Sequence, residues 1–471
     1  MRRNTTDQAS HYWLSRGSQT SGPALARKGL VRANYKIVYD DDGIFHPLGL
    51  TWFPGIYMLK HERSRLMAHL KWFATKRFDY LRSLGECDWV GRSWGPTEPD
   101  YFELLPEYVD LVYDHGMRLE LTLVGGRQTD PETGRPRFIP STFALRVADV
   151  LRSRAHKIMH YECANEWNRL DKVSMQDLER MGTVLGMATP NLVALSAPSG
   201  EREHAHLSAE EYETLMLAEE KPTQYSGYDD MIQATKRAGC SAFTIHPRRS
   251  SHDYGWSHVR QGYDFKDFPG ATKNNEPEGP QSSVVSMTNP LQLACCRLEG
   301  IMCGGASYVL HVGQGVTGTI DTNHGRPMNM WEVDNIDNII DAVRGCDDLM
   351  PPGVENWKCV NNGRSDHPLP LDGRDGFWES SGGNDRAPAV NKNYAAVSER
   401  EFRVMLTGVR SQGTVGPVSA TKGAHRRCHV EAWHPVTRRV VAEANLATGE
   451  SWTVPGQSDT MVAYVVKGWY L

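Results

Sequence analysis

Two short acidic motifs each place a glutamate where an expected strand gives way to a loop. The first, ANEWN, spans residues 164–168 and contains Glu166, and the second, NNEPEGP, spans 274–280 and contains Glu276. Two carboxyl groups held about 5 Å apart can cleave a glycosidic bond with retention, because one protonates the leaving oxygen while the other attacks the anomeric carbon. The motifs predict this chemistry if the fold brings the two strand ends together.

The elements that must position these glutamates alternate as strand and helix from about residue 30 to 345. The expected strands cover residues 44–53, 87–93, 118–124, 157–163, 191–196, 241–246, 271–275 and 306–311. The expected helices cover residues 63–84, 100–115, 142–156, 174–187, 229–238, 290–302 and 335–344. This order predicts an α/β fold, a (β/α)₈ TIM barrel whose strands all end at one mouth. A doubly wound open sheet is the alternative, but the first turn, WFPGI, lacks the glycine pattern of that fold.

The composition changes near residue 351, where the sequence reads PPG and then becomes rich in Gly, Asn, Asp and Pro. We therefore expect a flexible N-terminal arm over residues 1–30 and a catalytic barrel over 31–350. Residues 351–471 are expected to form a linker and a small C-terminal all-β domain, resembling a β-sandwich. Its β-like runs cover residues 402–407, 428–433, 439–442 and 461–466. This domain has two interpretations, a structural cap on the barrel and a carbohydrate-binding module.

Composition and charge limit the partners. A net charge of −5 and a pI of about 6.4 argue against nucleic acid and anionic membranes, and no run of about 18 apolar residues predicts a membrane span. The nine cysteines lack metal-site spacing, so we expect mostly buried free thiols and a reducing compartment. The N-terminus lacks a secretory pattern. Three locations fit: the cytoplasm, release by lysis as for a virus-encoded enzyme, or secretion with the signal missing from this sequence. The oligomeric state is not readable.

Three motifs carry a resemblance to a known family: DGIFHPLG at residues 42–49, WVGRSWG at 89–95 and ANEW at 164–167. Together with the element order over residues 30 to 345, they make the chain similar to the glycoside hydrolase clan A superfamily, with family 5 as the nearest type. The resemblance implies that Glu166 is the acid/base, that Glu276 is the nucleophile, and that Asn165 contacts the substrate 2-hydroxyl. It implies a carbohydrate substrate and no cofactor.

Two departures indicate a divergent branch of that superfamily. The surroundings of Glu276 differ from those usual in family 5, and they leave Glu278 as a rival nucleophile. Pro277 favours Glu276, because it ends the strand ladder just after that carboxylate. The eighth strand ends in LHVG, where many family 5 enzymes carry a tryptophan. The sugar, the linkage and the choice between endo and exo action are therefore not carried over.

Further residues at the expected strand ends are candidate substrate contacts. Arg92 and Trp94 follow the second strand and could bind and stack against a sugar, or they could be a salt-bridged arginine and a core tryptophan. His246 ends the sixth strand and His311 the eighth, and each could hydrogen-bond the nucleophile or a hydroxyl group.

The long aromatic segment after the sixth strand supplies Tyr254 and Trp256. Both suit a wall of sugar-binding subsites, because flat aromatic rings pack well against sugar rings. Their alternative role is to anchor the loop itself.

The leading prediction is a retaining glycoside hydrolase that cleaves β-glycosidic bonds of a polysaccharide or oligosaccharide by double displacement. A metal-dependent barrel hydrolase is a second possibility, for which His246, His252, His258 and His311 would be the ligand set. This metal-dependent alternative is disfavoured, because the first expected strand lacks the His-x-His motif that such a site requires and offers only His46. A third possibility is a catalytically silent carbohydrate-binding or structural barrel protein, such as a phage particle component.

Overall fold

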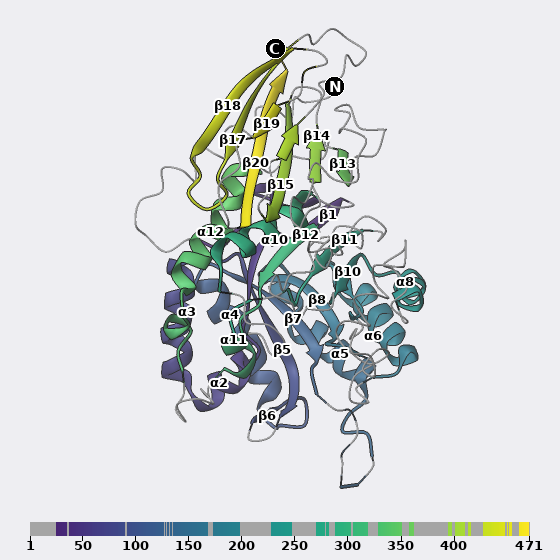
Figure 1. The fold of residues 1–471 in the computed structure, drawn as a ribbon. Helices are drawn as coiled ribbons and strands as arrows, with labels where there is room; N and C mark the ends of the chain where they lie inside the picture. The colour runs from purple at the N-terminus through teal and green to yellow at the C-terminus, as the bar shows by residue number, and fades with distance from the viewer. Residues whose placement is uncertain are drawn as a thin grey trace. The chain divides into compact units, whose positions relative to one another are not determined.

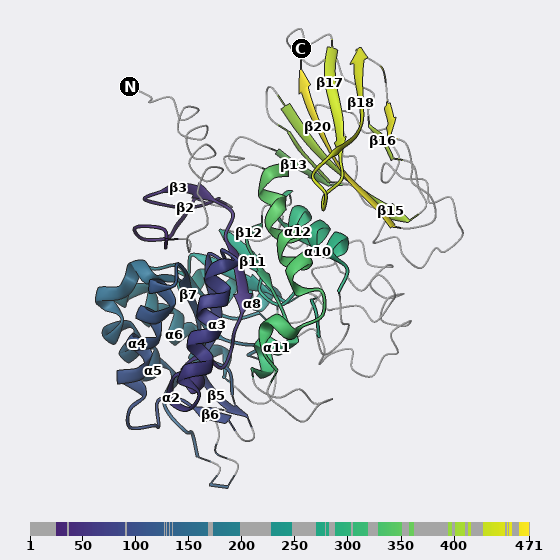
Figure 2. The same ribbon diagram turned by 90° about the vertical axis from the view of Figure 1, so that its left-hand side faces the viewer.

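The computed structural model describes residues 25–34, 37–89, 92–126, 128, 130, 132–133, 135–167, 173–197, 228–246, 270–277, 279–281, 288–302, 305–318, 328–350, 358–361, 394–397, 401–409, 413–415, 427–447, 450, 452–454 and 461–470. These residues divide into two compact units (Figures 1 and 2). The first falls within Met1–Arg248, Phe268–Ser286 and Ala306–Ile336. The second falls within Arg249–Asp267, Met287–Gly305 and Asp337–Leu471. The boundaries expected from the sequence stay predictions.

The first unit is built on the strands of a (β/α)₈ barrel. They are β4 (Leu48–Thr51), β5 (Tyr80–Trp89), β7 (Arg118–Val124), β8 (Ile158–Ala164), β9 (Val193–Ala194), β10 (Ala242–Ile245), β11 (Ala271–Asn274) and β12 (Gly305–Leu310). Their order in the sheet is β10-β11-β12-β4-β5-β7-β8-β9. The terminal strands also approach each other, because the Ser241 N–H donates to the Val193 carbonyl (3.2 Å). The barrel predicted from the sequence is confirmed.

Amphipathic helices follow the strands. Among the described residues, the helices of the first unit are α2 (Gly55–His61), α3 (Arg63–Thr75), α4 (Tyr101–Asp114), α5 (Pro140–Val150), η1 (Arg152–Lys157), α6 (Met175–Ala188), α8 (Tyr228–Arg237), α11 (Gly313–Thr317) and η2 (Met330–Glu332). In α4 the buried residues Tyr101, Leu105, Tyr108 and Val112 recur every three or four positions, which places one apolar face against the strands. Helix α6 begins after Ser174, whose hydroxyl accepts from the Asp177 N–H (3.1 Å).

A small antiparallel sheet covers the N-terminal ends of the barrel strands. It comprises β1 (Arg32–Asn34), β2 (Ile37–Asp40) and β3 (Gly43–Phe45). Val38 and Phe45 pack in one apolar cluster with residues at the starts of barrel strands, including Tyr80 and Met159. The opposite, C-terminal ends of the strands are thereby left for the site.

The second strand begins earlier than the sequence predicted. The expected helix 63–84 and strand 87–93 are wrong in this region: α3 ends at Thr75 and β5 starts at Tyr80. Arg77 adopts a left-handed backbone (φ 57°), which ends the helix. The apolar residues of 80–84 continue the helical spacing by coincidence, and this misled the sequence interpretation. The predicted strand 87–93 is instead a hairpin, because β6 (Arg92–Trp94) turns back antiparallel to β5.

The first expected strand, 44–53, is also divided. Its beginning belongs to β3 and its end to β4, with His46 and Pro47 between them. Proline has no N–H to donate to a ladder, so an interruption there is expected. Elsewhere the agreement is close: β7 and α10 (Pro290–Met302) have the bounds that the sequence predicted.

The second unit confirms the C-terminal all-β domain. Its six-stranded antiparallel sheet has the order β13 (Lys358–Asn361), β14 (Tyr394–Val397), β15 (Glu401–Val409), β20 (Met461–Tyr470), β17 (Arg427–Trp433) and β18 (Val440–Ala447). Strands β16 (Gly413–Val415) and β19 (Trp452–Val454) form a separate pair. Helices α10 and α12 (Ile336–Leu349) are grouped with this sheet, apart from the first residue of α12. Along β17, buried and half-buried residues alternate, which is typical of a strand with one face on a core.

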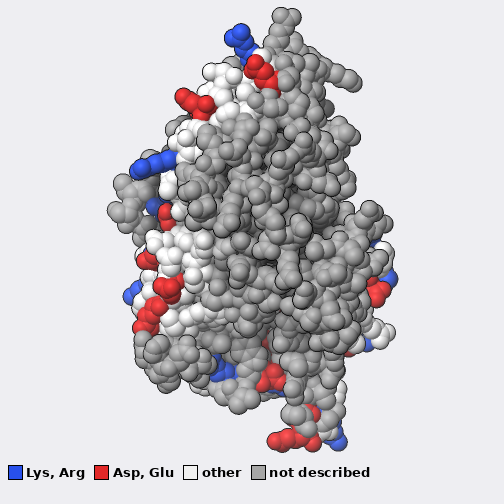
Figure 3. Space-filling view, viewed as in Figure 1, with Lys and Arg blue, Asp and Glu red and all other residues white. Residues whose placement is uncertain are grey.

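In Figure 3 the described Lys and Arg side chains are interspersed with described Asp and Glu side chains. Within the described residues, no helix is both long and apolar enough to cross a membrane. Cys163, Cys295 and Cys346 are buried free thiols, as expected from the sequence. Burial raises the pKa of Cys346 to about 12, which disfavours its reactive thiolate form.

Candidate active site

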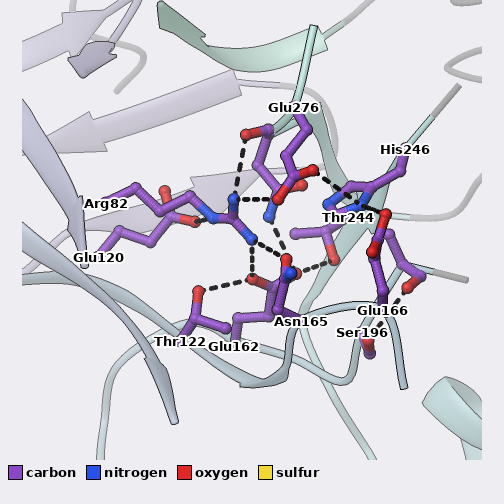
Figure 4. Close-up of polar contacts among 12 residues, drawn as sticks. Arg82, Glu120, Thr122, Glu162, Asn165, Glu166, Ser196, Thr244, His246 and Glu276 are labelled. Carbon is purple, nitrogen blue, oxygen red and sulfur yellow. Dashed lines mark hydrogen bonds and ion pairs between the residues drawn. The ribbon is translucent and has the colours of Figure 1, made fainter. Parts of the chain in front are cut away.

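The structure brings Glu166 and Glu276 together at the C-terminal ends of the barrel strands. Glu166 follows the end of β8 by two residues, and Glu276 follows the end of β11 by two residues. Both are buried, with 7% and 6% of their surface exposed, and one carboxylate oxygen of each lies within 4.8 Å of the other. Two strands separate β8 from β11 around the barrel, so the side chains converge from different parts of the mouth (Figure 4).

The backbone of Glu166 is held in an unfavourable conformation. Its φ of 48° lies in the left-handed region, which costs a non-glycine residue about 1–3 kcal/mol. Both neighbours are fixed: the Asn165 N–H donates to the Val124 carbonyl (2.8 Å), and the Trp167 N–H donates to Ser196 Oγ (3.2 Å). Strain of this kind gathers at functional sites, and here it sets the direction of the Glu166 side chain.

Glu276 is fixed by a cation and by its own turn. Arg82 Nη1 donates to Glu276 Oε1 (2.9 Å), and the Glu276 N–H donates to Asn274 Oδ1 (3.0 Å). Three residues later, Gly279 lies so close to the end of β12 that an added Cβ would meet the His311 carbonyl oxygen at 1.8 Å. Only glycine fits this close approach. The glycine of the NNEPEGP motif therefore has a packing reason.

His246 lies between the two glutamates. Its Nδ1 is 3.4 Å from Glu166 Oε1 and 3.7 Å from Glu276 Oε2, and the residue directly follows β10. His311 directly follows β12, and its Nδ1 is 3.0 Å from Thr51 Oγ1. Both histidines predicted from the sequence are thus at the strand ends, and His246 directly contacts a carboxylate of the pair.

Arg82 connects the site to the barrel interior. Besides Glu276, its Nη2 donates to Asn165 Oδ1 (2.7 Å) and Glu162 Oε2 (3.0 Å), and its Nε lies 3.2 Å from Glu120 Oε1 (Figure 4). Burial alone would lower the pKa of Arg82, but the nearby carboxylates outweigh it and raise the pKa. The guanidinium is therefore a permanent positive charge beside Glu276.

Beneath the two glutamates is a layer of four buried charged side chains, two cations and two anions: Arg82, Lys273, Glu120 and Glu162. Lys273 donates to Glu120, and although this carboxylate supports its charge, burial lowers the pKa of Lys273 to about 8. Burial would raise the pKa of Glu162, but Arg82 and other nearby cations outweigh burial and lower it. Burial raises the pKa of Glu120, although Lys273 and Arg82 oppose this, so the layer pairs two cationic side chains with two carboxyl groups in different surroundings.

A metal site is the alternative use of the two glutamates and His246. Their donor atoms all lie within 4.8 Å of one another, which is close enough for a shared cation. The fixed guanidinium 2.9 Å from Glu276 disfavours a second positive charge there. Of the other expected ligands, His311 bonds Thr51, while His252 and His258 lie outside the described residues.

The remaining candidate substrate contacts lie in different environments, and some fall outside the described residues. Trp94 is buried, and its indole N–H donates to the Leu84 carbonyl (3.1 Å), which is the geometry of a core tryptophan. Arg92 is half-buried, and burial lowers its pKa. Contact of either residue with a sugar stays a prediction. Three predicted residues lie outside the described part of the chain: Tyr254, Trp256 and Glu278.

Sequence reasoning missed the charged layer. Arg82 fell inside an expected helix, and Glu120, Glu162 and Lys273 were absorbed into expected strands. A signal was present, because strands β7 and β8 carry a glutamate among residues that are otherwise expected in a core. A charge inside a buried strand needs partners, so such positions indicate a polar network in the barrel interior.

Comparison with known proteins identifies solved structures that share this fold. No family model and no curated protein matches the sequence. A solved structure described as a glycoside hydrolase matches with a TM-score of 0.57 and 8% identity, over 94% of this chain and 97% of that chain. A glycoside hydrolase family 5 protein from Bacteroides vulgatus ATCC 8482 matches with a TM-score of 0.56 and 10% identity, over 95% and 93%. The chain thus has the fold of these glycoside hydrolases, and the resemblance to clan A is confirmed at the level of the fold.

Proposed function

We propose that the protein is a retaining glycoside hydrolase that cleaves β-glycosidic bonds of a polysaccharide or oligosaccharide. The observation that carries the proposal is the approach of the Glu166 and Glu276 carboxylates to within 4.8 Å. Retaining enzymes hold their two carboxyl groups about 5–5.5 Å apart, whereas inverting enzymes leave about 6.5–9.5 Å for a water molecule. The spacing favours direct attack by one carboxylate.

The surroundings of the two glutamates support different roles for them. Glu276 accepts from the permanently charged Arg82, which favours its ionised form and suits a nucleophile. Glu166 faces the imidazole of His246 instead. Glu166 would hold a proton that the negative charge on Glu276 helps it to retain, as a general acid requires.

The proposed reaction has two steps. In the first, Glu276 attacks the anomeric carbon while Glu166 gives its proton to the leaving oxygen, so the glycosidic bond breaks as a glycosyl ester forms. In the second, Glu166 takes a proton from water, and that oxygen attacks the anomeric carbon and releases Glu276. Asn165, whose side-chain oxygen Oδ1 accepts from Arg82, would contact the sugar beside the bond.

The first test is a panel of aryl β-glycosides and of mannan, glucan, xylan and galactan. Wild type should act on one class. Glu166→Gln should lower kcat by about 10²–10⁴-fold, as expected for loss of a general acid, and Glu276→Gln should lower it further. Glu278→Gln, which alters the rival nucleophile, is the matched control and should keep most of the activity. Near-normal turnover of Glu166→Gln and Glu276→Gln would refute the proposal.

The second test identifies the nucleophile and the stereochemistry. A 2-deoxy-2-fluoro aryl glycoside of the active class should label the peptide that contains Glu276, as read by mass spectrometry. Proton NMR of the first product should show retained anomeric configuration. Inversion, or a label on Glu278, would overturn the assignment. Binding of a polysaccharide without release of reducing ends would instead favour a silent carbohydrate-binding protein.

A further inference from the structure

The carboxylate of Glu162 lies below the proposed catalytic pair and is completely occupied by hydrogen-bond donors. Its Oε1 accepts from Thr244 Oγ1 (2.6 Å) and Asn275 Nδ2 (2.9 Å). Its Oε2 accepts from Thr122 Oγ1 (2.7 Å) and Arg82 Nη2 (3.0 Å). An ionised carboxylate offers about four lone-pair positions, so four donors saturate it. Glu162 is fully buried and has no position left for a substrate.

Three of the four donors come from parts of the barrel that carry the site. Asn275 directly precedes Glu276, Thr244 is two residues before His246, and Arg82 bonds Glu276 itself (Figure 4). Glu162 lies on β8, four residues before Glu166. One buried carboxylate therefore connects the strand that carries Glu166 with the elements that hold Glu276 and His246.

We propose that Glu162 is a positioning residue, which holds Asn275 and Arg82 so that the Glu276 carboxylate is aimed at the anomeric carbon. The inference rests on the proposed glycosidase function. Its physical basis is that a carboxylate bonded to charged and neutral donors from several strands fixes all of them at once. A displacement of about 1 Å at the attacking oxygen can cost about 10²-fold in rate. Loss of Glu162 therefore affects the attack more than it affects substrate binding.

Glu120 is a matched control within the same layer. It is as buried as Glu162, lies on the neighbouring strand β7, and also approaches Arg82, with 3.2 Å between its Oε1 and Arg82 Nε. Its other contacts are Lys273 in β11 and His160 in β8, and it does not bond the Asn275 and Thr244 that bond Glu162. Glu120→Gln perturbs the layer without releasing Asn275 or Thr244.

The experiment compares Glu162→Gln with Glu120→Gln in the full chain. The readout is the rate of inactivation by a 2-deoxy-2-fluoro glycoside with a dinitrophenolate leaving group, which needs attack by Glu276 but little help from an acid. Glu162→Gln should slow inactivation about 10²-fold while the inhibition constant of the released sugar changes less than about threefold. Glu120→Gln should slow inactivation less than about tenfold. Melting temperatures of both variants show whether each is folded.

A second variant keeps the proposal testable if Glu162→Gln does not fold. Asn275→Ala removes one donor from Glu162 and should slow inactivation by at least tenfold, and its effect should not multiply with that of Glu162→Gln, because both break one contact. Equal slowing by Glu162→Gln and Glu120→Gln, or independent effects of Glu162→Gln and Asn275→Ala, would overturn the positioning role. Absence of labelling in wild type would refute the glycosidase function, and with it this inference.

Discussion

Two buried glutamates in the barrel, Glu162 and Glu86, show how the surrounding charges decide the state of a carboxylate. Each is fully buried and each bonds an arginine, Arg82 or Arg137. Glu162 accepts four donors, and its pKa is lowered. Glu86, near the end of β5, accepts from Arg137 (2.8 Å) and the Gly126 N–H (3.0 Å), and burial raises its pKa to about 7.

The difference teaches that a single arginine does not keep a buried carboxylate ionised. Burial penalises the charged form of both residues, and around Glu162 the charges of Arg82 and other nearby cations outweigh that penalty, with a smaller contribution from the Thr244 hydroxyl. Around Glu86 the charge of Arg137 and the N–H groups of Gly126 and Gly125 do not outweigh burial, and the nearby Asp88 adds to the penalty. The barrel therefore holds a permanent negative charge beneath the proposed catalytic pair and a titratable one near the end of β5.

The largest expected effect comes from replacing Arg82. Arg82→Lys keeps the positive charge but loses the planar fork that bonds Glu276, Glu162 and Asn165 together. We expect kcat to fall by about 10²-fold or more, with a smaller change in KM. Steady-state kinetics on the active glycoside measure this. Arg137→Lys makes the same substitution at the arginine that bonds Glu86, and this control should keep kcat within about threefold. Equal losses of kcat in both variants would contradict the contrast between the Arg82–Glu162 and Arg137–Glu86 pairs.

The second effect concerns stability against pH. Because the folded pKa of Glu86, about 7, lies above its ordinary value of 4.5, the folded state binds more protons between these values. The stabilisation is complete below about pH 4.5 and is lost as the pH rises through about 7, by up to about 3 kcal/mol.

Urea unfolding of wild type and Glu86→Gln at intervals from pH 4.5 to 8 checks this expectation. The free energy of unfolding of Glu86→Gln should not show this part of the decline with rising pH, because glutamine does not titrate. Glu162→Gln should leave the decline in place. If wild type and Glu86→Gln follow parallel curves, the raised pKa of Glu86 is wrong.

The smallest effect is the loss of one donor from Glu162. Thr122→Val keeps the side-chain volume and removes the hydroxyl that donates to Oε2 (2.7 Å). We expect the free energy of unfolding to fall by about 1–2 kcal/mol, as for one hydrogen bond to a charged group. Kinetics should change little, because Arg82 and Asn275 stay bonded. A loss of catalytic rate as large as that of Glu162→Gln would contradict the idea that the four donors act together on Glu162.

Several elements could be predicted from the sequence because their patterns are local. The apolar run of β7 and the glycine after α4 set their own bounds, and the Asn-Glu motifs marked the ends of β8 and β11. The helix predicted over residues 63–84 was wrong, because apolar residues at three- and four-residue spacing continue from α3 into β5. A strand buried on both faces and a helix look alike over a few residues, and only the packing separates them.

The sequence by itself determined the order of strands and helices, the barrel class and the two glutamates, since each follows from periodicity or from a residue at a strand end. The tertiary structure decided the approach of Glu166 and Glu276 to within 4.8 Å, the left-handed turn at Glu166, and the convergence of donors on Glu162. The physical reason is sequence distance: Arg82 and Glu276 are 194 residues apart, and no local pattern encodes a contact that only closing the barrel creates.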